Sequence, residues 1–343
     1  MLKLFTISIV SIVTLLTSIS QRTCNKPKAQ QPVVQFKVPE GFPTPQYNFT
    51  NNAVTEQGFY LGKKIFYDNQ LSSDGQVSCA NCHQQFASFV MYDHDLAHGV
   101  NDQHSTRNPQ PLINLAWHKE YMWDGGITNL EVQPLAPFTA SNEMNISLPQ
   151  IITKLQADTS YTAMFANAYG DTAINSQRIL KAITQYLVML VSANSQYDKY
   201  IKGTATFTEL EKLGYQVFKN KCNNCHTEPL FTDLSYRNIG LPISNYLVDV
   251  GRMKITNNRA DSLKFKVPTL RNAALTMPYT HDGRIGTLDL MIDHYRHNVV
   301  NDFSTDSLVR KRIAISNTEK AALVAFIKTL TDTAFTKNKL FAK

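Results

Sequence analysis

Two short motifs of cysteine and histidine could do chemistry in this chain. Both have the pattern Cys-x-x-Cys-His, and together they use four of the five cysteines. In such a motif the two thiols can form thioether bonds to a haem, and the histidine can bind its iron. A zinc or thiol-redox role is disfavoured because a histidine directly follows each cysteine pair. The sequence therefore predicts two c-type haems, held by Cys79, Cys82 and His83 and by Cys222, Cys225 and His226.

Helices are the elements that must position these motifs, because few segments alternate like strands. Long helix-poor stretches lie at 84–139 and 227–282. A haem protein tolerates such stretches, since the porphyrin supplies much of the core, and long loops often carry function. We therefore predict a mainly α protein with two cytochrome c-like haem domains and long loops. The expected helices cover 55–66, 149–156, 161–169, 176–191, 208–219 and 316–330.

The beginning of the chain is typical of an exported protein. Lys3 precedes an apolar run at 4–16 that is too short to span a membrane comfortably, and no later segment is apolar enough to do so. The odd cysteine, Cys24, is either a lipid anchor or part of an unstructured linker. We expect a leader at 1–23, a Pro- and Gln-rich linker at 24–48, and haem domains at 49–200 and 201–343, with a boundary near 193–207.

Charge and composition exclude other classes. The net charge is +7 and the hydrophobic share is 43%, which is normal for a soluble globular protein. No basic run is long enough to suggest a nucleic-acid partner.

The segments around both motifs resemble the bacterial di-haem cytochrome c peroxidase family, which includes the MauG-type enzymes. The resemblance extends from about residue 58 to about residue 331 and keeps the order of many short motifs. After the first haem motif these are Thr106-Arg107-Asn108-Pro109, Trp123-Asp124-Gly125, Leu130-Glu131-x-Gln133 and Asn142-Glu143-Met144. After the second they are Phe231-Thr232-Asp233, Lys266-Val267-Pro268-Thr269-Leu270-Arg271-Asn272 and Pro278-Tyr279-x-His281-Asp282-Gly283.

The resemblance implies an axial ligand for the second haem besides His226. Counting from His281 to the position where the peroxidases carry a Met leads to Tyr295, and MauG-type enzymes carry a Tyr there. A phenolate favours ferric iron and lowers the potential, whereas a thioether raises it. We favour Tyr295, with Met291 one helical turn earlier and His294 as rivals.

The resemblance also implies a peroxide site at the first haem. Gln133 and Glu143 keep the spacing at which the family has its hydrogen-bonding Gln and its acid–base Glu. Glu143 would move a proton between the peroxide oxygens, and Gln133 would donate a hydrogen bond to the oxygen at the iron. Trp123 stands where the family has a Trp between the haems, as an electron relay or as a packing residue.

Two further metal contacts are implied less directly. His98, followed by a glycine, fits loosely the loop histidine that caps the first iron in many family peroxidases, but His94 and His104 compete with it and MauG-type enzymes leave this iron open. The family's calcium site matches Asn108, Thr276 and Pro278, which offer one side-chain oxygen and two backbone carbonyls.

Three functions remain open on these grounds. The first is a periplasmic peroxidase, a homodimer by expectation, that reduces hydrogen peroxide with electrons from a small cytochrome or copper protein. The N-terminal domain would be peroxidatic, and electrons would enter through the C-terminal domain. The second is a MauG-like enzyme that oxidises a protein or organic substrate by long-range electron transfer, which Tyr295 favours. The third is a plain electron carrier, against which Gln133 and Glu143 argue.

Overall fold

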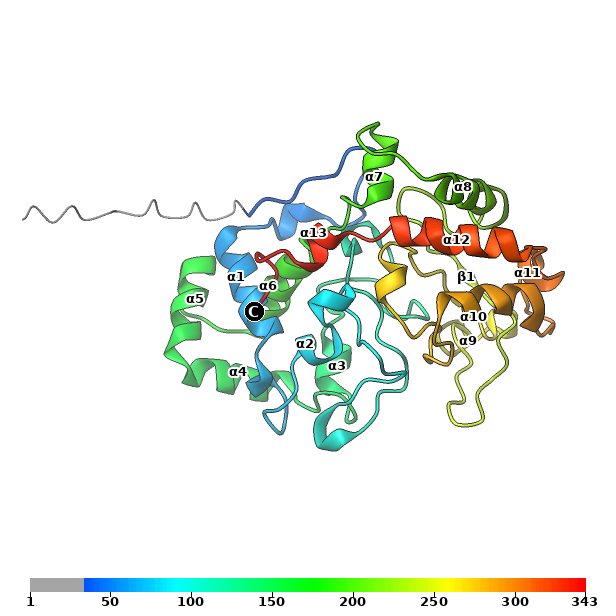
Figure 1. Ribbon diagram of the computed structural model, residues 1–343. Helices are drawn as coiled ribbons and strands as arrows, with labels where there is room; N and C mark the ends of the chain where they lie inside the picture. Colours follow the sequence, from blue (N-terminus) through cyan, green and yellow to red (C-terminus); the bar gives the residue numbers. More distant parts are fainter. Residues whose placement is uncertain (1–33) are drawn as a thin grey trace, which may run out of the picture. The chain divides into compact units, whose positions relative to one another are not determined.

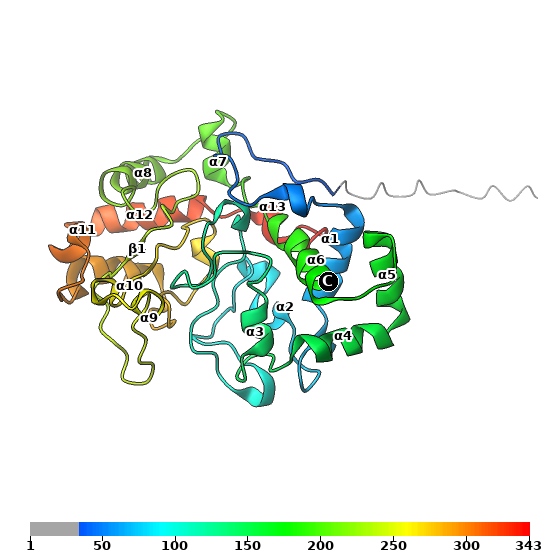
Figure 2. The same cartoon turned by 180° about the vertical axis from the view of Figure 1, so that it is seen from behind.

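The computed structural model describes residues 34–343, and helices dominate it (Figures 1 and 2). The leader at 1–23 and Cys24 lie outside the described residues. The predicted mainly α fold is confirmed. The longer helices are α1 (Glu56–Phe66), α4 (Leu148–Ala157), α5 (Thr159–Tyr169), α6 (Ser176–Val188), α8 (Glu209–Lys221) and α12 (Asn317–Thr329). The short helices are α2 (Cys79–Cys82), α3 (Leu135–Thr139), α7 (Gln196–Ile201), α9 (Met253–Thr256), α10 (Leu288–Asp293), α11 (Ser307–Arg310) and α13 (Thr333–Thr336).

The six longer helices match the six predicted ones to within a few residues at each end. Their caps explain where they begin. Thr55 accepts a hydrogen bond from the Gly58 amide at the start of α1, and Ser316 forms a capping box with Glu319 at the start of α12. Gly170, at a φ of 84°, ends α5 in the left-handed conformation, directly after the last residue of the predicted helix.

Each haem motif has its own helix pair and its own apolar core. On one side α1 packs against α6, and on the other α8 packs against α12, as both views show (Figures 1 and 2). A glycine permits each close crossing: a Cβ at Gly62 would lie 1.8 Å from the carbonyl oxygen of Ala182, and one at Gly214 would lie 1.9 Å from that of Ala322. The first core gathers around Phe59 and the second around the fully buried Phe326.

Both ends of the described chain pack on the first core. Within the predicted linker, Phe36 and Phe42 lie against Trp117, with ring centroids 5.8 and 5.1 Å away. At the other end Phe335 and Phe341 are buried in the same core. Residues 34–48 are therefore packed against the protein. The domain limits themselves stay a prediction.

The loops contain more structure than their sequences indicated. The first helix-poor stretch ends in α3, and the second holds α9 and a two-residue antiparallel ladder of β1 (Tyr236–Arg237) and β2 (Phe265–Lys266). Helix α7 lies inside the predicted boundary at 193–207. A π-helical turn, His294–Asn298, directly continues α10. Such turns are rare in proteins, and those that occur are often found at functional sites.

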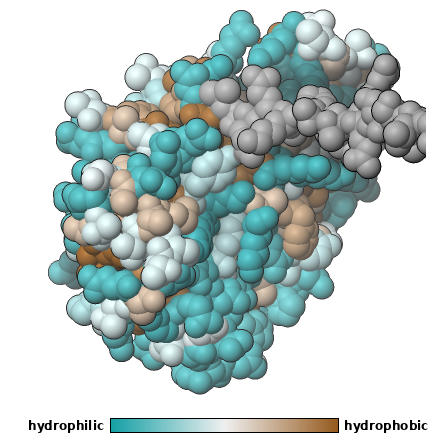
Figure 3. Space-filling view, turned by 90° about the vertical axis from the view of Figure 1, so that its left-hand side faces the viewer, coloured by the Kyte–Doolittle hydropathy of each residue, from teal (hydrophilic) through white to brown (hydrophobic). Residues whose placement is uncertain are grey.

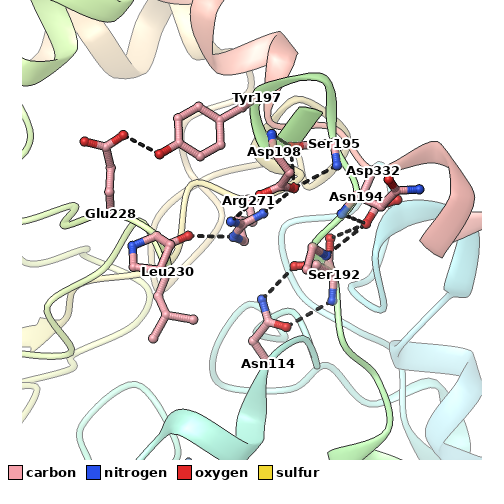
Figure 4. A network of polar contacts seen from close by, with 12 residues as sticks. Asn114, Ser192, Asn194, Ser195, Tyr197, Asp198, Glu228, Leu230, Arg271 and Asp332 are labelled. Atoms are coloured by element: carbon pink, nitrogen blue, oxygen red, sulfur yellow. Dashed lines mark hydrogen bonds and ion pairs between the residues drawn. The ribbon is translucent and has the colours of Figure 1, made fainter. Parts of the chain in front are cut away.

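A buried ion pair fixes the second haem motif to the rest of the fold (Figure 4). The Arg271 side chain is fully buried, and its guanidinium donates to both carboxylate oxygens of Asp198 at 2.9 and 2.8 Å. Its Nε donates to the carbonyl oxygen of Pro229, three residues after His226. Arg271 therefore links α7 to the chain that leaves the haem motif.

The carboxylate of Asp332 fixes the neighbouring segment of the chain, residues 192–194. It accepts hydrogen bonds from the Ser192 hydroxyl and from the amides of Ala193 and Asn194 (Figure 4). Asn114 and Ser192 complete the connection to the first half of the chain by two hydrogen bonds, at 3.2 and 3.0 Å.

Replacing Asp198 by Asn should destabilise the protein by about 3–5 kcal/mol, because it leaves the buried Arg271 guanidinium without its anion. Although burial raises the pKa of Asp198, the Arg271 guanidinium holds it below its ordinary value. The stabilisation is therefore present above the ordinary Asp range and is lost as the pH falls through the lowered pKa. Urea unfolding of the holoprotein at neutral pH measures the loss.

The matched control is Asp171→Asn, which removes the partner of Arg178 in an exposed ion pair. Exposed pairs contribute little, so this variant should unfold close to the wild type. Equal unfolding midpoints for the Asp198 and Asp171 variants would contradict the role given to the buried pair.

No helix within residues 34–343 is both long and apolar enough to cross a bilayer. The face shown in Figure 3 is mostly hydrophilic, with apolar residues in small separate groups.

Candidate functional site

The structure contains two large cavities, each of which is lined by one of the Cys-x-x-Cys-His motifs. Cys82 and His83 line the first cavity, and Cys222, Cys225 and His226 line the second. The first motif forms α2, whose N-cap Ser78 shares a capping box with Asn81. The second motif begins where α8 ends.

Both motif histidines are oriented for binding iron. His83 Nδ1 lies 2.8 Å from the carbonyl oxygen of Phe89, and His226 Nδ1 lies 3.1 Å from that of Pro268. A nitrogen that faces a carbonyl must carry the proton, so Nε2 keeps its lone pair for a metal. Burial lowers the pKa of His83 to about 4 and also lowers that of His226, which keeps both rings in the neutral, ligating form.

The two cavities share a wall that contains Trp123. The residue is 9% exposed, lines both cavities, and donates from Nε1 to the carbonyl oxygen of Asn108 at 2.8 Å. The backbone of Lys266 in β2 donates to the Trp123 carbonyl oxygen at 2.7 Å. Trp123 therefore lies where the two cavities adjoin, and its place between two haems stays a prediction.

Gln133 and Glu143 are brought together at the first cavity, which both residues line. Burial raises the pKa of Glu143 above its ordinary value. After burial itself, the charge of Glu143 is the largest cause that raises the pKa of Cys82 to about 12, so the carboxyl group lies near the first motif. Gln133 Nε2 contacts the sulfur of Met122 at 3.6 Å, which holds the amide at the cavity wall.

Of the three candidates for a further ligand to the second haem, two line the second cavity. Tyr295 and Met291 do so, from the π-helical turn and from α10. His294 is not among the lining residues, and its Nε2 lies 2.9 Å from the carbonyl oxygen of Ile239. Burial and then the nearby thiols of Cys222 and Cys225 raise the pKa of Tyr295, which places its ring beside the motif. His294 is therefore the weakest candidate, and Tyr295 stays a prediction.

His98 is not among the residues that line the first cavity. Its Nδ1 contacts the carboxylate of Asp102, and its ring lies 4.4 Å from that of His104 and 5.4 Å from that of His94, measured between centroids. The preceding residue, Ala97, does line the cavity. Iron capping by His98 would therefore need a movement of this loop, and it stays a prediction.

The three candidate calcium ligands line the same cavity. Asn108, Thr276 and Pro278 all line the second cavity, and Asn108 also lines the first. The Asn108 amide group donates to the carbonyl oxygen of Asp95 at 2.9 Å, so its side-chain oxygen faces the other way. The arrangement is compatible with an oxygen-ligated cation.

The sequence motifs contained two site residues whose roles were not predicted. Arg107 forms ion pairs at 2.6 Å with Asp124 and with Asp249, which lines the first cavity. Lys266 is buried and lines both cavities. A lysine directly between the apolar residues Phe265 and Val267 was the available signal.

These features together test whether the chain can hold the predicted groups. Each cavity combines a motif histidine with a free Nε2, at least one motif cysteine and a mainly apolar lining. The residues present therefore fit two covalently attached haems. Cys79, Cys82 and His83 would hold the first, and Cys222, Cys225 and His226 the second.

Comparisons with known proteins agree with this geometry. Residues 56–206 match the family model described as di-haem cytochrome c peroxidase. The chain is 33% identical to the methylamine utilization protein MauG of Methylophilus methylotrophus, over 87% of this chain and 88% of that protein. It is 33% identical to cytochrome c551 peroxidase of Nitrosomonas europaea, over 79% of each chain.

A solved structure extends the likeness to the whole fold. It is the crystal structure of a MauG-like protein associated with microbial copper homeostasis, which is 29% identical, with a TM-score of 0.81, over 90% of this chain and 98% of that one. The chain, with its two haem-attachment motifs in two adjoining cavities, therefore belongs to the di-haem cytochrome c peroxidase family and binds two c-type haems.

Proposed function

We propose that the protein is a peroxidase that reduces hydrogen peroxide to water with electrons from a small cytochrome or copper protein. The observation that carries the proposal is the meeting of Gln133 and Glu143 with Cys82 and His83 at one cavity. A protein that only transfers electrons does not require a buried acid–base group at its haem. Peroxide reduction needs one, because two protons must join the oxygens as two electrons arrive.

Glu143 is the group that handles the proton in this proposal. It accepts a proton from one peroxide oxygen and returns it to the other, so that the leaving oxygen departs as water. Burial favours this role, because it raises the pKa of Glu143 toward the working pH. The Gln133 amide donates a hydrogen bond to the oxygen that gains charge. The bound haem supplies the redox chemistry.

Trp123 supports a route for the electrons. It touches both cavities, and its indole N–H is fixed by the Asn108 carbonyl group. Electrons that enter at the His226 side can therefore reach the His83 side through a single side chain. The direction of the route follows from the place of Glu143, which lines only the first cavity.

A steady-state assay tests the proposed function. A reduced small c-type cytochrome is mixed with the holoprotein, and its oxidation is followed in its visible absorption after addition of hydrogen peroxide. We expect donor oxidation that depends on both peroxide and holoprotein. Protein prepared without haem is the control for adventitious oxidation.

A MauG-like activity is the second candidate, and Tyr295 is the observation that favours it. The residue lines the second cavity, and relatives named MauG are among the similar proteins. Such an enzyme would react with peroxide in the fully ferric state, without prior reduction. A spectral change on adding peroxide to ferric protein favours this candidate, and a reaction only after half-reduction favours the peroxidase.

Several features of the setting belong to the same proposal. Export to the periplasm fits the apolar run near the N-terminus, and a lipid anchor at Cys24 remains an alternative to a plain linker. A calcium ion between the haems fits Asn108, Thr276 and Pro278. The homodimer stays an expectation.

A further inference from the structure

Lys266 is a buried cation at the wall that separates the two cavities. Its residue is 3% exposed, and it lines both cavities. The ammonium group donates one hydrogen bond, to the carbonyl oxygen of Glu120. Because an ammonium group has three donors, this single bond leaves it poorly satisfied.

The nearby carboxylates are already engaged with other cations. Glu120 pairs with Arg252 at 3.3 Å, and Asp124 pairs with Arg107 at 2.6 Å. Neither forms an ion pair with Lys266, and no other carboxylate within residues 34–343 does so. A buried charge without a counter-ion is costly, and proteins retain one where a ligand provides the opposite charge.

The groups that fill the two cavities bring such charges. Each haem has two propionate carboxylates, and Lys266 is the buried lysine that both cavities share. We propose that the Lys266 ammonium binds a haem propionate at the shared wall and thereby raises the reduction potential of that haem. The wall also holds Trp123, whose carbonyl oxygen accepts from the Lys266 amide, so the cation lies beside the proposed electron route.

The sign of the effect follows from the charge change at the iron. Reduction removes one positive charge from the haem, so a fixed cation nearby stabilises the reduced state more than the oxidised state. The ammonium group is shielded from water, so its effect is screened little by salt. In the chain without haem, burial lowers the pKa of Lys266 to about 8, which agrees with a cation whose partner is the haem.

Potentiometric titration of the holoprotein tests this proposal independently of activity. Lys266→Met keeps an unbranched side chain as far as Cε and removes the charged nitrogen. We expect the midpoint potential of one haem to fall and the resonance Raman band of its propionate to shift. A fall at the His83 haem identifies the propionate as that of the first haem, and a fall at the His226 haem identifies it as that of the second.

Three further variants serve as controls for this test. Lys266→Arg retains the charge and should keep the midpoint near that of the wild type. Lys266→Gln is a second neutral variant and should also lower the midpoint potential. It replaces the methionine variant in the test if that variant fails to fold. Lys254→Met is the matched control, because Lys254 lines the first cavity but is exposed. Midpoints in Lys266→Gln equal to those in Lys254→Met would overturn the proposal.

Discussion

Replacing Glu143 by Gln should lower peroxide turnover by about 10²–10⁴-fold while both haems stay attached, because positioned acid–base groups contribute rate factors of this size. The amide fills the same space at the first cavity but cannot accept and return a proton. Stopped-flow measurement of the peroxide-dependent absorption change, at matched haem content, gives the rate.

The control for this variant is Glu131→Gln, the same chemical change just outside the site. Glu131 accepts a hydrogen bond from Tyr47 at 2.9 Å and does not line the first cavity. It should react with peroxide at the wild-type rate. Equal rates in the Glu143 and Glu131 variants would show that the proton passes through another group.

Replacing Tyr295 by Met should raise the midpoint potential of the second haem by an amount on the order of 0.2 V. Axial ligands set haem potentials over a range of ~0.8 V. The anionic phenolate stabilises ferric iron, whereas the thioether stabilises ferrous iron. Spectroelectrochemical titration of the holoprotein measures the midpoint. The neighbouring first haem serves as an internal reference, because Tyr295 does not line its cavity.

Two variants separate Tyr295 from its remaining rival. Tyr295→Phe keeps the ring and removes the oxygen, so it should abolish any absorption band that arises from phenolate bound to iron. Met291→Leu should leave both the spectrum and the midpoint unchanged. The reverse pattern, a shift in Met291→Leu and none in Tyr295→Phe, would assign the ligand to Met291.

The sequence predicted the regular helices and the haem motifs because both depend on local patterns. Capping residues such as Thr55 and Ser316 mark helix starts within a few residues. The Cys-x-x-Cys-His spacing is likewise local. Both signals lie within a few consecutive residues, so the sequence alone contains them.

The remaining features depend on contacts between distant segments. Helix α7 is short: a capping box of Ser195 and Asp198 begins it, and the pairing of Asp198 with Arg271, which is distant in the chain, fixes it in the fold. The burial of Lys266 depends on the position of β2, whose Lys266 backbone amide donates a hydrogen bond to the Trp123 carbonyl oxygen. His98 shows the converse: its position in the sequence suggested the haem, but Asp102, four residues later, is its contact in the structure.

The central claim is that the first cavity reduces peroxide with electrons drawn from a protein donor. The most direct measurement is the number of donor molecules oxidised for each molecule of peroxide consumed, in the cytochrome assay with limiting peroxide. The account predicts two one-electron donors oxidised per peroxide, a total that the Glu143→Gln variant approaches far more slowly. Consumption of peroxide without oxidation of any small redox donor would contradict it.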